Sequence, residues 1–277
     1  MRLSEWVKLN STILYPEFKT HANYLNYMSD QSQKIKLSSN LKINKLMQKI
    51  KKLEQKKYLA KLTLRNIREE FKTVLIYPEY AIVCVSWIPV KAYYLIFNMV
   101  SILEYLIMDD LYYLSASHKN VNDLLKNLIA KGSLVFNKQE FNKIYNVAVI
   151  DGLKDIPPGE NVKTLSFDPE KRHKQIIKKL LDYQKEDFKT KQKIKVLSGN
   201  ILKKFKQSNI TYLLDFFYLY RIKANYRDME FVDKGVSLEE FKDFYEKYYL
   251  LTLNFYNCFK DCINQLSVLR LGEKLIQ

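Results

Sequence analysis

The chain has 277 residues and a formal net charge of +16, from 46 Lys and Arg residues against 30 Asp and Glu residues. Glycine and proline are scarce, at six each, which favours long helices over a many-stranded β protein and predicts an all-α fold. No GxGxxG, GxxxxGK[ST], HExxH, GxSxG or CxxC motif occurs, so nucleotide binding through a Gly-rich loop is excluded.

The N-terminal part, residues 1–75, is expected to contain one long basic helix. Residues 1 to about 35 show no sustained period, and a short helix is possible there. From Ser38, a plausible N-cap, apolar residues recur at helical spacing among many lysines. These apolar residues are Leu41, Leu46, Ile50, Leu53, Leu62 and Leu64. The basic outer face is either solvated or a contact surface for a phosphate backbone, with Lys49, Lys52 and Lys56 as its candidates.

After a break at Tyr77-Pro78-Glu79, the stretch from Trp87 to Asp110 predicts the central helix of the fold. Pro89 suits a first helical position, and apolar residues cover most of the circumference, as in a helix surrounded by others. The stretch is long enough to cross a bilayer. Ionisable and polar residues spaced through the apolar region favour a soluble core instead. They are Glu79, Lys91, Asn98 and Glu104.

The first half of the bundle, residues 76–155, is predicted to contain two further helices. Ser117 is placed to cap a helix that ends near Gly132, and His118, in its first turn, is interpreted as a capping or packing residue rather than a catalyst. Asn137 and Glu140 resemble a capping box for a helix that continues to about Asp151.

Residues 156–207 are predicted to form a basic helical insertion. Asp155-Ile-Pro-Pro-Gly is the most loop-like stretch, and Asp168-Pro169 has the signature of a helix start. Lysines dominate the segment that follows, and Lys178 and Lys179 are further candidates for contact with a polyanion. Ser198-Gly199 predicts a turn.

The second half of the bundle, residues 208–277, is predicted to contain two helices. One runs from Ile210 to about Asp228 and becomes polar at Arg221. Ser237 and Glu240 make a capping box for the last helix, whose aromatic-rich face is typical of a core. That face consists of Leu238, Phe241, Phe244, Tyr245, Tyr248, Thr252, Phe255, Phe259, Cys262 and Leu266.

The cysteines and histidines give no sign of a metal centre or a cofactor. Cys84, Cys258 and Cys262 have no metal-ligand spacing with the three histidines, and we interpret Cys258 and Cys262 as small core residues. The N-terminus lacks an uninterrupted apolar segment of the secretory type, so we expect a cytoplasmic protein.

Arg221 is the candidate functional residue. On a helix, Asn225 and Asp228 share its side, and a buried guanidinium needs a carboxylate partner, either Asp228 or Glu104. The residues favour a polar lock between helices. The alternative is an arginine that handles an anion in a cleft lined by Asn225 and Tyr226.

Three blocks of sequence resemble the HEPN superfamily of small α-helical domains. They are Lys91-Ala-Tyr-Tyr-Leu-Ile-Phe97, similar to an AYYAxF helix; Ser117-His-Lys-Asn-Val121, similar to an SHKGV helix; and Arg221-Ile-Lys-Ala-Asn-Tyr226, similar to an R-x-x-A-D-Y segment. The resemblance implies an up-down bundle of four or five helices, usually dimeric, often in toxin–antitoxin or phage-defence systems. Here it would carry an extra N-terminal helix and the basic insertion.

The same resemblance implies that Arg221 is the functional arginine of the family. RNase members also require a histidine four to six residues further on, but positions 226 to 228 are Tyr, Arg and Asp. Loss of that histidine favours a binding or regulatory role, in which Asn225 and Arg227 contact an anion. A degenerate RNase that uses Arg221 and Tyr226 without a metal remains open.

The charge of +16 attracts polyanions over long range, although lysines at solvated positions would give the same total. The charge favours a nucleic acid as partner, and the resemblance to the HEPN superfamily implies a homodimer and RNA rather than DNA. We expect no contact with a membrane. A partner protein such as a nucleotidyltransferase-like antitoxin is possible. A non-catalytic protein–protein interaction module is the alternative from another class.

Overall fold

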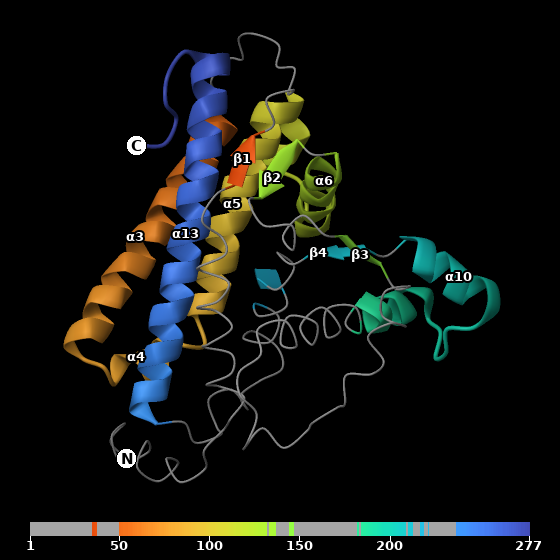
Figure 1. The fold of residues 1–277 in the computed structure, drawn as a ribbon, viewed down its shortest axis with the longest axis horizontal. Helices are drawn as coiled ribbons and strands as arrows, with labels where there is room; N and C mark the ends of the chain where they lie inside the picture. The colour runs from red at the N-terminus through yellow and green to blue at the C-terminus, as the bar shows by residue number, and fades with distance from the viewer. Residues whose placement is uncertain are drawn as a thin grey trace.

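The computed structural model is dominated by three long helices. It describes residues 35–37, 50–131, 133–136, 144–146, 182, 184–208, 210–212, 217–218, 221 and 237–277. Helices α3 (Lys51–Ile76), α5 (Ile88–Met108) and α13 (Leu238–Leu271) lie side by side (Figure 1). The short α4 (Tyr80–Cys84) connects the first two, and α6 (His118–Ala130) packs against α5. The described part of the chain is mainly helical, in agreement with the predicted class, although it also holds two short pairs of strands.

Helix α5 is the centre of the bundle, as its composition predicts. It is buried almost all round, from Ile88 to Leu106, and Pro89 stands in its first turn. It ends at Asp109, which adopts the left-handed conformation (φ 57°). Among the described residues, α5 is the one helix long and apolar enough to cross a membrane, and 78% of its most apolar window is buried against other helices.

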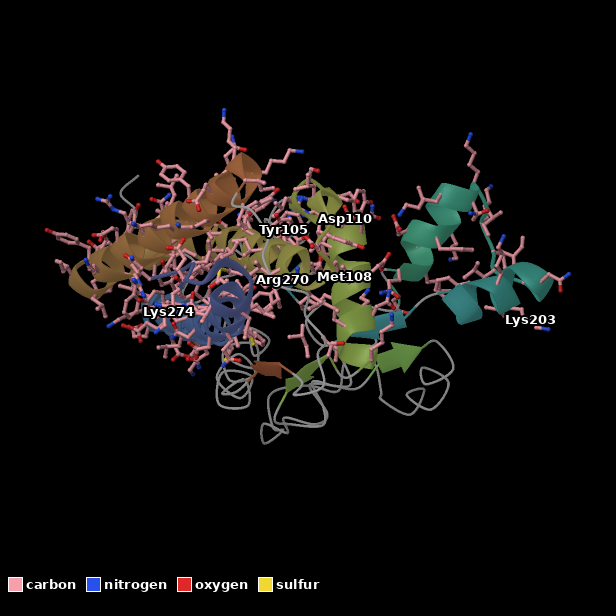
Figure 2. All side chains as sticks on the ribbon, turned by 90° about the horizontal axis from the view of Figure 1, so that it is seen from above. Tyr105, Met108, Asp110, Lys203, Arg270 and Lys274 are labelled. Carbon is pink, nitrogen blue, oxygen red and sulfur yellow. The ribbon has the colours of Figure 1, made fainter. Side chains whose placement is uncertain are left out.

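The C-terminal end of α5 is closed by a buried arginine from α13. Figure 2 shows Arg270 beside Tyr105 and Met108. Its Nη2 donates a hydrogen bond to the carbonyl oxygen of Ile107 (3.1 Å), and its Nη1 lies 3.4 Å from the carboxylate of Asp109. A cation at this position complements the free carbonyls and negative dipole of a helix C-terminus, so Arg270 fixes α13 against α5.

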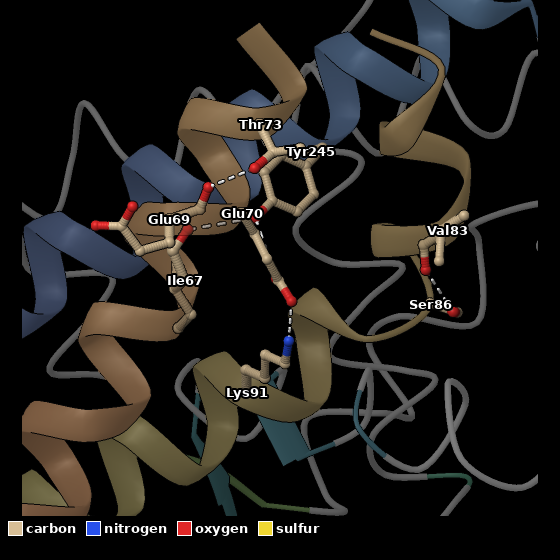
Figure 3. Close-up of polar contacts among 8 residues, drawn as sticks. All are labelled: Ile67, Glu69, Glu70, Thr73, Val83, Ser86, Lys91 and Tyr245. Carbon is tan, nitrogen blue, oxygen red and sulfur yellow. Dashed lines mark hydrogen bonds and ion pairs between the residues drawn. The ribbon is translucent and has the colours of Figure 1, made fainter. Parts of the chain in front are cut away.

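A polar clamp of Glu70, Lys91 and Tyr245 joins all three long helices (Figure 3). Lys91 of α5 forms an ion pair with Glu70 of α3, and the hydroxyl of Tyr245, on α13, donates to the other oxygen of Glu70 (3.4 Å). Burial, followed by the nearby Glu70 carboxylate, raises the pKa of Tyr245. The clamp sets the register of the helices in an interface that is otherwise mostly apolar.

The helix boundaries at the capped ends are confirmed. The side chain of Ser117 accepts from the Asn120 amide at the start of α6. Ser237 and Glu240 form the expected capping box of α13 (3.2 and 3.0 Å). The expected core face of α13 is also confirmed, because Phe241 to Leu266 of that list are buried, while Leu238 is partly buried.

Two predicted helices are wrong in part. Ile144–Asn146 (β3) and Ile210–Tyr212 (β4) are strands that pair with each other, antiparallel, with Ile144 opposite Tyr212. Ile35–Leu37 (β1) pairs in the same way with Leu134–Phe136 (β2). These stretches are rich in β-branched and aromatic residues, which suit strands. Pairing between distant segments overrides the local helical pattern.

The remaining described elements are short. A 3₁₀ helix, η1 (Leu111–Leu114), precedes α6, and α10 (Gly199–Ser208) begins at the predicted turn, where Gly199 has φ 52°. In α3, Leu53 and Leu64 face the core as predicted, but Leu62 is 41% exposed. The predicted capping box at Asn137 and Glu140, the N-cap at Ser38, the helix starting at Asp168 and the C′ residue Gly132 lie outside the described residues.

Candidate anion-binding site

Arg221 lies among three tyrosine rings, and it forms no ion pair with a carboxylate of the described residues. Its Nη2 donates to the hydroxyl of Tyr94 (3.2 Å). Its Cζ is 5.1 Å from the ring centroid of Tyr93, 5.3 Å from that of Tyr94 and 5.9 Å from that of Tyr218. Cation–π attraction therefore holds the guanidinium. Its Nε is buried and has no hydrogen-bond partner within the described residues.

His118 forms the second part of the site, at the first position of α6. Its Nδ1 is 2.9 Å from the hydroxyl of Tyr93, and its ring lies 4.3 Å from that of Phe97. Burial lowers the pKa of His118 from 6.5, and the positive charges of Arg221 and Lys56 lower it further. The imidazole is therefore mostly neutral at neutral pH in the absence of an anion.

Lys56 approaches the site from α3. Its ammonium donates to the side-chain oxygen of Asn98 on α5 (3.2 Å) and stands 4.5 Å from the ring centroid of Phe97. Burial lowers the pKa of Lys56 as well. Sequence analysis placed this lysine on the solvated outer face of its helix. That expectation is wrong, because the side chain is half-buried and turns towards α5.

Arg221 and Lys56 place two positive charges beside the neutral imidazole of His118, and the described residues supply no carboxylate that pairs with either cation. Within the described part of the chain, neither Arg221 nor Lys56 has an ion-pair partner. Like charges in a partly buried place repel one another, and a bound anion removes that repulsion. The chemistry of these residues suits a phosphate group, with aromatic rings alongside.

The predicted polar lock between Arg221 and Glu104 does not form. Glu104 is fully buried on α5, and neither carboxylate oxygen has a hydrogen-bond partner among the described residues. Burial raises its pKa to about 9, an effect that the backbone of Leu125 only partly offsets. The guanidinium of Arg221 instead contacts Tyr94, which lies on α5 ten positions before Glu104. Aromatic rings, and not the Glu104 carboxylate, therefore surround this guanidinium.

Of the other predicted site residues, only Lys52 lies in the described part of the chain, apart from Glu104. Lys52 is exposed on α3. Seven candidates lie outside the described residues: Lys49, Lys178, Lys179, Asn225, Tyr226, Arg227 and Asp228.

Sequence analysis did not place His118 near Arg221. The signal was present in the three resembling blocks, since the first supplies Tyr93 and Tyr94, the second His118 and the third Arg221. Treating the blocks separately left a lone histidine in a first helical turn. Their meeting at one place gives that histidine a cationic neighbour and an aromatic wall.

Within the described residues, no group of three or more Cys, His, Asp or Glu side chains is arranged to hold a metal ion. No family model matches the chain, and no curated protein or solved structure matches it either. The resemblance to the HEPN superfamily stays a prediction.

Proposed function

We propose that this chain is a HEPN-like protein that binds single-stranded RNA at the Arg221 site, as a cytoplasmic component of a toxin–antitoxin or phage-defence system. One observation carries the proposal: Arg221, His118 and Lys56 gather beside aromatic rings, and within the described residues neither Arg221 nor Lys56 has an ion-pair partner. A homodimer, and a partner such as a nucleotidyltransferase-like antitoxin, belong to the same proposal.

The mixture of cations and rings favours a nucleic acid over a small inorganic anion. Lys and Arg neutralise phosphates, while aromatic faces offer stacking surfaces to unpaired bases, and the two together are typical of single-strand binding sites. Tyr94 is 36% exposed, so its ring is open to a stacking base. The charge of +16 adds long-range attraction for a polyanion.

Binding is tested with a fluorescent RNA tetranucleotide and the purified full chain. Arg221→Ala removes the fork that contacts phosphate, and we expect affinity to fall at least about tenfold. Tyr94→Phe keeps the ring and removes only the hydroxyl that now occupies Nη2, so it serves as the matched control and changes affinity less than about threefold. Unchanged binding by Arg221→Ala contradicts the proposal.

A degenerate, metal-independent RNase is the second candidate, and His118 is the observation that favours it. When Nδ1–H donates to the Tyr93 oxygen, Nε2 presents a lone pair that can take the proton of a ribose 2′-hydroxyl. The 2′-oxygen then attacks phosphorus, a 2′,3′-cyclic phosphate forms, and the 5′-oxygen leaves with a proton from water. Arg221 would stabilise the negative charge that develops on the phosphate oxygens.

Cleavage is tested by incubating labelled RNA with the chain in the presence of a chelator. The candidate predicts cyclic-phosphate ends and a loss of at least about a hundredfold in His118→Gln, since general-base catalysis contributes on this order. Lys203→Ala, an exposed change on α10, is the control and keeps full activity. Intact RNA with the unaltered chain removes the RNase candidate and leaves the binding proposal standing.

A further inference from the structure

A second basic feature lies on the other side of α3. A cleft of about 690 Å³ runs between α3 and the C-terminal half of α13, closed at one end by the segment that follows α13. Its floor includes Leu64 and Met99. Lys274 marks this side of the molecule in Figure 2, at the opposite end from Lys203 of α10.

The lining of this cleft is strongly cationic. Basic side chains number seven, against the two acidic side chains Glu69 and Glu273. The basic residues are Lys57, Lys61, Arg65, Arg68, Lys72, Lys260 and Lys274. Those on α3 recur every three or four positions, so they form one row about 22 Å long with one cation per turn.

Several of these cations have no ion-pair partner among the described residues. Lys57 pairs with Glu54 and Lys72 with Glu69, in exposed pairs of small energetic value (3.1 and 3.0 Å). Within the described residues, no ion pair involves the other exposed or half-exposed cations of the row and its opposite wall. These are Lys61, Arg65, Lys260 and Lys274.

We propose that this cleft binds the sugar-phosphate backbone of a nucleic-acid strand without reading its bases. A row of cations spaced by about 6 Å per turn can meet successive phosphates of an extended strand. The aromatic ring that lines the cleft, Tyr256, is only 5% exposed, so it offers no stacking platform. The cleft therefore differs from the Arg221 site, where the partly exposed ring of Tyr94 accompanies the charges. The identity of the ligand rests on the proposed function.

The test uses the triple variant Lys61→Ala, Arg65→Ala, Lys260→Ala and a long oligouridine, titrated over a range of salt concentrations. Each lost phosphate contact lowers the slope of log K against log[salt] by about 0.7 for a single strand, so we expect the slope to fall by about 2. Affinity at low salt should fall at least about tenfold. Binding of the tetranucleotide should not change, because it occupies only the Arg221 site.

A charge-matched triple, Lys131→Ala, Lys195→Ala, Lys203→Ala, controls for net charge, since all three lysines are exposed and lie outside the cleft. An equal loss in this control, or an unchanged slope in the cleft triple, overturns the inference. Inorganic polyphosphate, which has no bases, should compete with the long RNA in the unaltered chain. Failure to compete overturns the backbone-only mode.

The two proposals fail separately. If Arg221→Ala leaves tetranucleotide binding intact while the cleft triple still lowers the slope for the long RNA, the Arg221 site is wrong and the cleft stands. If Arg221→Ala weakens both RNAs and the cleft triple weakens neither, the cleft is wrong and the proposed function stands.

Discussion

At the scale of single residues, the carboxyl of Glu104 is an ionisable group in an apolar environment. It lies in an apolar helix, 0% exposed, and its oxygens have no hydrogen-bond partner in the described part of the chain. Burial raises its pKa from 4.5 to about 9, so the folded protein holds this proton at neutral pH while the unfolded chain releases it. The free energy of unfolding therefore falls as pH rises from about 4.5 towards about 9.

Glu104→Gln removes this linkage and keeps the shape of the side chain. We expect the variant to gain stability relative to the unaltered chain as pH rises, by at most about 3 kcal/mol at pH 7, and to differ little near pH 4.5. Chemical denaturation across this pH range measures the difference. Glu79→Gln, at an exposed carboxylate, is the control and should show no such trend. A pH-independent difference for Glu104→Gln would contradict the burial argument.

At the scale of elements, the Glu70 clamp decides how α3, α5 and α13 fit together. The side chain of Glu70 is 18% exposed and that of Lys91 is 29% exposed. Without Glu70, the largely buried ammonium of Lys91 would lose its ion pair, and the hydroxyl of Tyr245 would lose its hydrogen bond to the carboxylate.

Glu70→Ala should therefore destabilise the fold by about 2 kcal/mol or more. Its neighbour on α3, Glu69, supplies a matched control, because it pairs with Lys72 in solvent, with the two side chains 59% and 66% exposed. Glu69→Ala should cost less than about 0.5 kcal/mol. Urea denaturation of the two variants measures both values. Equal costs would show that the clamp contributes no more than a surface ion pair.

At the scale of the whole molecule, two cationic features flank α3. Lys56 leads to the Arg221 site on one side of the helix, while Lys61 and Arg65 open into the cleft on the other. The partly exposed ring of Tyr94 belongs to the first, whereas the ring of Tyr256 in the second is buried. Helix α3 thus separates the Arg221 site, which suits bases and phosphate, from the cleft, which suits phosphate alone. The net charge of +16 would attract a polyanion to either place.

The amino-acid sequence by itself determined the elements that are encoded locally. The central helix from Ile88 to Met108, the caps at Ser117 and Ser237 and the core face of α13 follow from composition, side-chain periodicity and capping chemistry, which act over a few residues.

Only the tertiary structure decided which distant residues meet. The pairing of β3 with β4, the inward turn of Lys56 and the contact of Arg221 with Tyr94 join positions far apart in the chain. No local pattern encodes such contacts, because they depend on how helices pack. For the same reason, sequence analysis offered Glu104 as one of two possible partners of Arg221, whereas its carboxyl has no hydrogen-bond partner among the described residues. The ring of His118 packs against Phe97 as predicted, but the sequence did not show that Arg221 and Lys56 lie near enough to lower its pKa.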